Sequence, residues 1–303
     1  MKENESKEII QLIKDLSREA PGALLSSKER SRFIRDLTNI LTRLRSNQYK
    51  ISSFTRSALM VKEREEDFFT ELDFYCSLGR SWRKALESFN IKKTKSILDL
   101  CPGANPKIEI ALAQMGYQHN LTLADSSNEA LLRSASFIKL FDPRFKLNLK
   151  KQELWKISGK FDLIVGNHIF DDILLSDHCA RNGQDLNQAY SNEERLKRTW
   201  QNLAQEQESC SIKLASKLAK KINALLTEKG AVILTHYPSY VERSLKMTEA
   251  GNKIARFIEC FLSELLFHEP YEFKFISTSK IKLNSSSRLK KSDFIILQKV
   301  SPK

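Results

Sequence analysis

Apolar residues in the first part of the chain recur at the three- and four-residue spacing of amphipathic helices. Four stripes can be followed, through residues 9–16, 33–44, 59–72 and 82–89. Pro21-Gly22 separates the first stripe from the second, and Ser26 with Glu29 has capping-box spacing before the second. The pattern predicts an all-helical N-terminal region over residues 1–85, with the apolar stripes as its core faces.

The pattern changes at Ile91, after which short apolar runs alternate with helical segments. Such alternation is typical of parallel strands that are connected by helices. No Ser/Gly-rich linker separates the two regions, so we expect the helical region to pack on a sheet domain over residues 86–303. The predicted strands are residues 96–100, 121–124, 145–149, 161–165, 231–235, 272–276 and 293–298.

The segment between the fourth and fifth predicted strands is longer than an ordinary crossover needs. Its first part, residues 176–190, is polar and predicts a loop, whereas residues 192–226 carry apolar positions at helical spacing. We therefore expect a helical insertion at about residues 171–228. It would lie at an edge of the sheet, where connecting segments often carry function.

Composition excludes several classes of protein. The 303 residues are 41% hydrophobic with 9 glycines and 7 prolines, which fits a packed globular chain rather than a low-complexity one. No apolar run has the length of a signal-peptide core or a membrane span, and the 5 cysteines include no C-x-x-C pair. These features predict a reduced cytoplasmic protein without a membrane contact or a structural zinc site.

The formal net charge of +13 leaves two interpretations open. A basic surface can serve a polyanionic partner such as RNA, because phosphate contacts dominate the affinity of such complexes. It can also be an ordinary solvated surface. The spread of Lys and Arg along the chain favours this second interpretation.

Residues 96–107 read SILDLCPGANPK, an apolar strand followed by a tight turn and the start of a helix. Asp99 lies near the end of the strand, and Gly103 lets the backbone approach a ligand closely. Asn105-Pro106 suits an N-cap and a first helical residue. Because free N–H groups at the start of a helix bind polar ligand groups, the segment predicts a ligand-binding turn.

A second acid ends the next predicted strand, where residues 121–125 read LTLAD. Ser126 and Glu129 have capping-box spacing, so a helix should start directly after Asp125. An acid about 20 residues beyond a glycine turn can accept hydrogen bonds from both hydroxyls of a ribose. Asp125 is therefore a predicted nucleoside-binding residue, although a simple N-cap aspartate would show the same local pattern.

Two later segments complete a pattern. Residues 161–174 read FDLIVGNHIFDDIL, a buried strand followed by polar residues, and residues 225–234 read LLTEKGAVIL, a helix end, a glycine turn and a strand. In this order, the four segments resemble class I S-adenosylmethionine-dependent methyltransferases over roughly residues 86–298. Asp99 and Gly103 match the acid and the middle glycine of the family's first motif, whereas Cys101 and Asn105 replace its outer glycines.

The resemblance implies a Rossmann-like α/β fold, with a mostly parallel seven-stranded sheet flanked by helices, and S-adenosylmethionine as the cofactor. Asn167 would lie beside the sulfonium, and Glu153 or its neighbour Gln152 would meet the adenine. A nicotinamide-dependent Rossmann enzyme is the main rival, but its pyrophosphate normally requires the outer glycines. The cofactor-binding residues implied by the resemblance are Asp99, Cys101, Gly103, Asn105, Asp125, Ser126, Glu153 and Asn167.

Methyl transfer is an in-line displacement, so the enzyme chiefly aligns the acceptor with the methyl group. A general base helps where the acceptor is a hydroxyl or a protonated amine. His168, Asp171 and His236 are the candidate catalytic residues, with Asp172 beside them, because all should lie at the carboxyl edge of the sheet. Asp171-Asp172 and His178 do not have metal-ligand spacing, so no metal is predicted.

The acceptor remains open between a small molecule and RNA, with the small molecule slightly favoured. A small acceptor would lie beneath a lid of N-terminal helices and residues 171–190, lined by Tyr75, Trp82 and Tyr190.

An RNA acceptor would use the basic surface and the N-terminal helices. The tetrapeptide GANP at residues 103–106 resembles the G-x-N-P of aminoglycoside-resistance 16S rRNA methyltransferases. Gly166-Asn167, however, stands where those enzymes typically carry Leu-Lys. A non-catalytic binding protein with the cofactor fold is the third alternative.

Overall fold

The computed structural model describes most of the chain beyond residue 77. The described residues are 78–89, 91, 94–103, 106–141, 146–190, 192–238, 240–243, 245–267, 273–283, 287 and 289–300. The predicted helices before residue 78, Tyr75 and the predicted cofactor residue Asn105 lie outside them.

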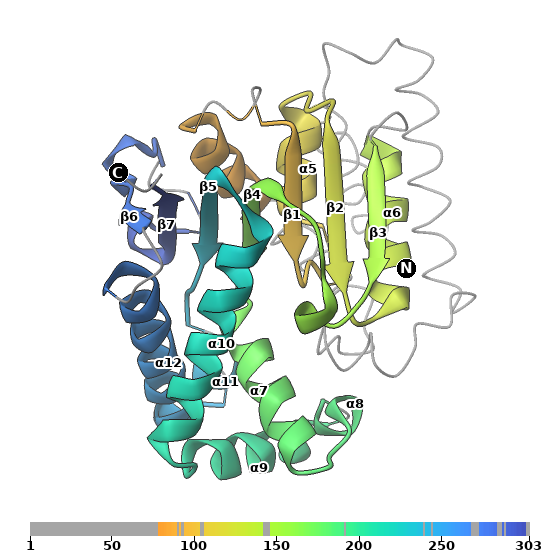
Figure 1. Cartoon of the computed structure of the whole chain (residues 1–303). Helices are drawn as coiled ribbons and strands as arrows, with labels where there is room; N and C mark the ends of the chain where they lie inside the picture. The colour runs from red at the N-terminus through yellow and green to blue at the C-terminus, as the bar shows by residue number, and fades with distance from the viewer. Residues whose placement is uncertain are drawn as a thin grey trace, which may run out of the picture.

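Seven strands form one sheet in the order β3-β2-β1-β4-β5-β7-β6 (Figure 1). β7 runs antiparallel to β5 and β6, and the other neighbouring pairs are parallel. This confirms the predicted Rossmann-like α/β fold with a mostly parallel sheet. The strands are β1 (Ser96–Leu100), β2 (Asn120–Asp125), β3 (Leu147–Lys151), β4 (Phe161–Asn167), β5 (Leu226–Thr235), β6 (Phe273–Phe275) and β7 (Phe294–Lys299).

The strand order reverses at β1, which has β2 on one side and β4 on the other. In open α/β sheets, ligands bind outside the carboxyl ends of the strands at such a switch point. In Figure 1 the insertion after β4 lies beyond this same edge, where α7, α8 and α9 project past the ends of β1, β2 and β3. The predicted site residues therefore lie in the part of the fold where a ligand is expected.

Helices cover both faces of the sheet. An N-terminal helix spans residues 78–87, and three short 3-10 turns are η2 (Leu154–Lys156), η3 (Thr278–Lys280) and η4 (Lys291–Asp293). The α-helices are α5 (Ile108–Gln114), α6 (Asn128–Phe141), α7 (Phe170–Arg181), α8 (Leu186–Ala189), α9 (Glu193–Ala204), α10 (Glu208–Leu225), α11 (Tyr240–Arg243) and α12 (Thr248–Phe267). None of the helices described is both long and apolar enough to cross a membrane.

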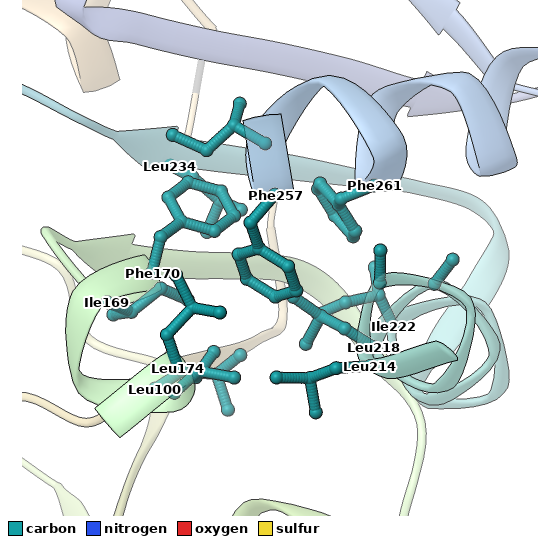
Figure 2. Close-up of a cluster of buried hydrophobic side chains, with 14 of the residues drawn as sticks. Leu100, Ile169, Phe170, Leu174, Leu214, Leu218, Ile222, Leu234, Phe257 and Phe261 are labelled. Carbon is teal, nitrogen blue, oxygen red and sulfur yellow. The ribbon is translucent and has the colours of Figure 1, made fainter. Parts of the chain in front are cut away.

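Alternating side chains of the buried strands divide the core into two clusters. In β4, Leu163 and Val165 join the cluster that contains α5, α6 and the helix over residues 78–87, whereas Ile164 joins the opposite one. Figure 2 shows part of the second cluster, in which Phe170 of α7 packs against Phe257 and Phe261 of α12. α7 and α12 are thereby packed on one face of the sheet, and α5, α6 and the helix over residues 78–87 on the other.

The helix over residues 78–87 crosses the predicted domain boundary at residue 85. Trp82 is fully buried in the core and packs edge-on against Phe294 of β7 at a ring-centroid distance of 5.5 Å. The prediction that Trp82 lines an acceptor cavity is therefore wrong. Its indole is instead a structural link between this helix and the sheet.

Three local predictions also differ from the structure. Residues 176–181 belong to α7 rather than to a loop, and the predicted helix over residues 192–226 breaks into α9 and α10. Gly230 lies within β5, not in a turn, because the pairing with β4 jumps from Phe161↔Leu226 to Leu163↔Ala231. The extra residues of β5 form a bulge, whereas the sequence pattern predicts a turn at this place.

Candidate functional site

The turn after β1 lies against the carboxyl end of β2. The backbone N–H of Gly103 donates to Oδ2 of Asp125 at 3.2 Å, and the N–H of Cys101 donates to the carbonyl of Ala124 at 2.9 Å. Gly103 has φ +70°, and a Cβ built on it would meet no atom of the described residues within 4 Å. The turn thus exposes bare backbone to open space beside a carboxylate.

Asp125 is held by backbone donors on both oxygens. Its Oδ1 accepts from the N–H of Ser127 at 2.8 Å, so the carboxylate bridges the β1 turn and the start of α6. Burial raises the pKa of Asp125 above 3.8 although these hydrogen bonds oppose the shift. The cap of α6 is Ser127, whose Oγ accepts from Ala130, so the capping box predicted for the exposed Ser126 is wrong.

Asp99 lies below the same turn and is 1% exposed. Neither of its carboxyl oxygens has a hydrogen-bond partner among the described residues. Burial and the nearby carboxyl of Glu109 raise the pKa of Asp99 well above 3.8, against the opposing charge of Lys107. A buried carboxyl without a partner is costly, so this position favours a cationic or hydrogen-bond-donating group.

The β3 end of the site is more open. The N–H of Gln152 donates to the carbonyl of Asp125 at 3.0 Å, which places this segment next to the nucleoside-binding candidate. Glu153 follows it with a side chain 59% exposed, in a surface ion pair with Lys156 at 3.2 Å. Glu153 is therefore reachable from solvent at this edge.

Asn167 ends β4, and its side chain is engaged within the protein. Its Oδ1 accepts from Nε1 of Trp82 at 2.8 Å and from Oγ1 of Thr235 at 3.1 Å. Its Nδ2 donates to the hydroxyl of Tyr237 at 3.0 Å. The amide that the sequence suggested for the sulfonium thus connects the helix over residues 78–87, β4 and the end of β5.

His168 follows in a left-handed conformation, with φ +61°. Its Nε2 lies 3.2 Å from Oδ2 of Asp171 on the first turn of α7. Its ring stacks on Tyr237 at 4.4 Å and 11°, and on His236 at 5.5 Å and 15°. The structure therefore brings together the three predicted catalytic residues, and it adds Tyr237, which the sequence did not single out.

The charges within this group oppose one another. Burial would lower the pKa of His168, but the carboxylate of Asp171 outweighs it and raises this pKa above 6.5. Burial and the charge of His168 lower the pKa of His236 below 6.5. Burial would raise the pKa of Asp171, but His168 lowers it below 3.8. His168 is accordingly the imidazole that holds a proton more firmly, and His236 is the neutral one at pH 7.

Asp172, the next residue of α7, accepts from the hydroxyl of Tyr190 at 2.5 Å. Its side chain is exposed, yet burial among protein atoms and the carboxylate of Asp171 raise its pKa to about 7. Within the residues the structure covers, no group of His, Cys, Asp and Glu is arranged to hold a metal ion.

No protein-family model and no curated protein matches this chain. Solved structures do match, at low identity. The magnesium protoporphyrin IX methyltransferase of Synechocystis PCC 6803 with bound SAH is 12% identical with a TM-score of 0.44, and the match covers 88% of this chain and 99% of that one. A plantazolicin methyltransferase in complex with SAH is 15% identical with a TM-score of 0.39, over 96% and 99% of the two chains.

A candidate O-methyltransferase from Nostoc punctiforme PCC 73102 is 11% identical with a TM-score of 0.44. The match covers 73% of this chain but 56% of that one, so this chain spans little more than half of it. At these identities and TM-scores the likeness carries no inference about activity. The function proposed for the chain therefore rests on its own site.

Proposed function

We propose that this chain is an S-adenosylmethionine-dependent methyltransferase that acts on a small-molecule acceptor. The observation that carries the proposal is the contact between Gly103 and Asp125 at the switch point of the sheet. There a glycine turn with open space above it is bonded to a carboxylate at 3.2 Å. Bare backbone and an acid are what a nucleoside needs for close approach and for hydrogen bonds to its ribose hydroxyls.

The residues present fit this cofactor. The oxygens of Asp125 accept from the backbone N–H groups of Gly103 and Ser127, and a carboxylate can accept further hydrogen bonds from ribose hydroxyls. Asp99 supplies a buried carboxyl without a hydrogen-bond partner among the described residues, which an ammonium group would satisfy. When bound, S-adenosylmethionine supplies an electrophilic methyl group on a cationic sulfur. Cys101, Ser126 and Glu153 complete the edge at which we propose it binds.

We propose that His168, Asp171 and His236 serve the acceptor. His236 is neutral at pH 7 because its pKa is lowered, so it can accept a proton from an acceptor hydroxyl or amine. Asp171 holds His168 in orientation through the contact at 3.2 Å. Asp172 on the first turn of α7 and Tyr190, which follows α8, add a hydrogen-bonded polar pair beside them.

The charge of this edge favours a small acceptor over RNA. Asp125 and Asp171 place carboxyl groups at it, and Asp172, with a pKa of about 7, adds a partial negative charge, so a phosphate backbone brought to this edge would be repelled. Binding to a structured RNA should accordingly be weak at moderate salt. Tight RNA binding that falls steeply with added salt would instead favour the RNA alternative.

The cofactor assignment is tested by calorimetric titration with S-adenosylhomocysteine (SAH). Asp125→Asn should weaken its affinity by about 10-fold or more, because hydrogen bonds to a charged acceptor are lost. Asp162→Asn is the matched control, since Asp162 is a partly buried aspartate that also accepts from two backbone N–H groups, at the opposite edge of the sheet. Equal affinities for the two variants, or no binding by the unaltered protein, would refute the proposal.

A further inference from the structure

Asn167 is the centre of a buried hydrogen-bond network. Its side chain is 9% exposed, and three hydrogen bonds join it to Trp82, Thr235 and Tyr237. A carboxamide has two acceptor and two donor positions, so one donor position remains for any other group. The network spans three elements: the helix over residues 78–87, β4 and the segment after β5.

Tyr237 extends this network to His168. Its hydroxyl accepts from Asn167, and the face of its ring lies 4.4 Å from the imidazole of His168 with only 11° between the planes. His168 has φ +61°, which a non-glycine residue keeps only where its surroundings fix it. The imidazole is thus fixed by the ring of Tyr237 and by the carboxylate of Asp171.

We propose that Asn167 is a positioning residue for His168. It holds the ring of Tyr237 in place, and it ties this ring to Trp82 on the helix over residues 78–87. This role differs from the cofactor contact that the resemblance implied. The positioning role rests on the proposed function in one respect, namely that His168 serves the acceptor. The hydrogen-bond network itself exists without a ligand.

The titration of His168 reports its position, since charged groups face it from several elements. Asp171 and Asp172 lie on α7, Glu242 lies on α11, and His236 follows β5. These groups are unchanged in a variant of Asn167. A different pKa of His168 in such a variant would therefore mean that the imidazole has moved relative to them.

The test is a histidine-resolved NMR titration of the full-length protein without cofactor. The chain has 5 histidines, and a His168→Gln variant assigns the signal of His168. In Asn167→Ala the pKa of His168 should fall toward 6.5, as contact with Asp171 loosens. Tyr237→Phe, which removes only the hydroxyl, should give the same fall, and the double variant should give no further one.

Ser81→Ala is the control for general loosening of the helix over residues 78–87. Ser81 is a buried residue of this helix whose Oγ accepts from the N–H of Leu289. It should lower Tm and leave the titration of His168 unchanged. If Asn167→Ala does not fold, Tyr237→Phe decides the question alone.

SAH affinity separates positioning from direct cofactor contact. If Asn167 only positions His168, the affinity of Asn167→Ala for SAH should stay within about threefold of that of the unaltered protein. An unchanged titration of His168 in folded Asn167→Ala or Tyr237→Phe overturns the proposal, and a 10-fold loss of affinity beside it would make Asn167 a cofactor contact. Absence of SAH binding by the unaltered protein counts against the proposed function alone, because the titration is measured without ligand.

Discussion

Two turns at the carboxyl edge follow neighbouring strands, and both contain a left-handed residue. After β1 there are two, Cys101 with φ +53° and Gly103 with φ +70°, and no atom of the described residues lies within 4 Å of where a Cβ of Gly103 would be. After β4 there is His168, with φ +61°, whose ring is stacked on Tyr237 and paired with Asp171. The first turn leaves its space open, and the second fills its space with its own side chains.

The polar groups of the two regions differ in the same way. Both oxygens of Asp99 lack a partner among the described residues, whereas the amide of Asn167 makes three hydrogen bonds within the protein. Buried polar groups are normally satisfied, so an unsatisfied one marks a place where a partner is expected. The β1 turn is therefore suited to receive a ligand. The β4 region combines the fixed amide of Asn167 with titratable side chains that keep buried atoms without a partner among the described residues: Nδ1 of His168 and of His236, and Oδ1 of Asp171.

The largest effect is expected from a side chain that fills the open space at the turn after β1. Gly103→Val should weaken SAH affinity by at least about 30-fold, close to 2 kcal/mol. A β-branched side chain would occupy the space against which we propose the nucleoside lies, and it would strain a backbone with φ +70°. Calorimetric titration measures the loss directly.

Gly183→Val separates strain from occupancy. Gly183 has φ +62° and also has no atom within 4 Å of a built Cβ, but it lies just beyond the end of α7 that is opposite Asp172. Gly183→Val should lower Tm to a degree similar to Gly103→Val, and it should leave SAH affinity unchanged. If both variants lose affinity equally, the β1 turn is not the binding surface.

The β1 region could be predicted from sequence because its determinants are local. Strand, acid and glycine turn lie within residues 96–103, and Asp125 ends the next strand, so each signal can be read in a short window. The parallel sheet brings them together without further information, since carboxyl ends of parallel strands share one edge. The contact between Gly103 and Asp125 is the outcome of that arrangement.

The β4 region could be predicted only in part. His168 and Asp171 are only three positions apart, on either side of the start of α7, so their proximity is a local feature of the chain. The partners of Asn167 lie 85, 70 and 68 positions away at Trp82, Tyr237 and Thr235, and no local pattern pairs them. The bulge that absorbs Gly230 depends likewise on the register between β4 and β5.

A smaller effect, on the pH dependence of Tm, is expected from Asp172 on the first turn of α7. The pKa of Asp172 is raised to about 7 by burial and by Asp171, so its stabilising contribution is complete below about pH 3.8 and is lost as pH rises through about 7. Tm should therefore decline over this range, and Asp172→Asn should reduce the decline by about 2 °C. Calorimetric scans at several pH values measure it.

Tyr190→Phe is the opposing variant. The hydrogen bond from Tyr190 lowers the pKa of Asp172, so its removal should raise that pKa and move the decline to higher pH. Curves for Asp172→Asn and the unaltered protein that run parallel from pH 4 to pH 8 would show that Asp172 is an ordinary surface carboxylate.

The smallest effect is expected at Glu153, the outermost residue of the open region. Its side chain is 59% exposed and pairs with Lys156, so any hydrogen bond it makes to a ligand competes with water. Glu153→Gln should change SAH affinity by less than about threefold, which is under 1 kcal/mol. Lys156→Gln, which removes the other partner of the ion pair, should match it. A 10-fold loss in Glu153→Gln alone would mean that this carboxylate becomes buried against the ligand, and that the open region closes over its cofactor after all.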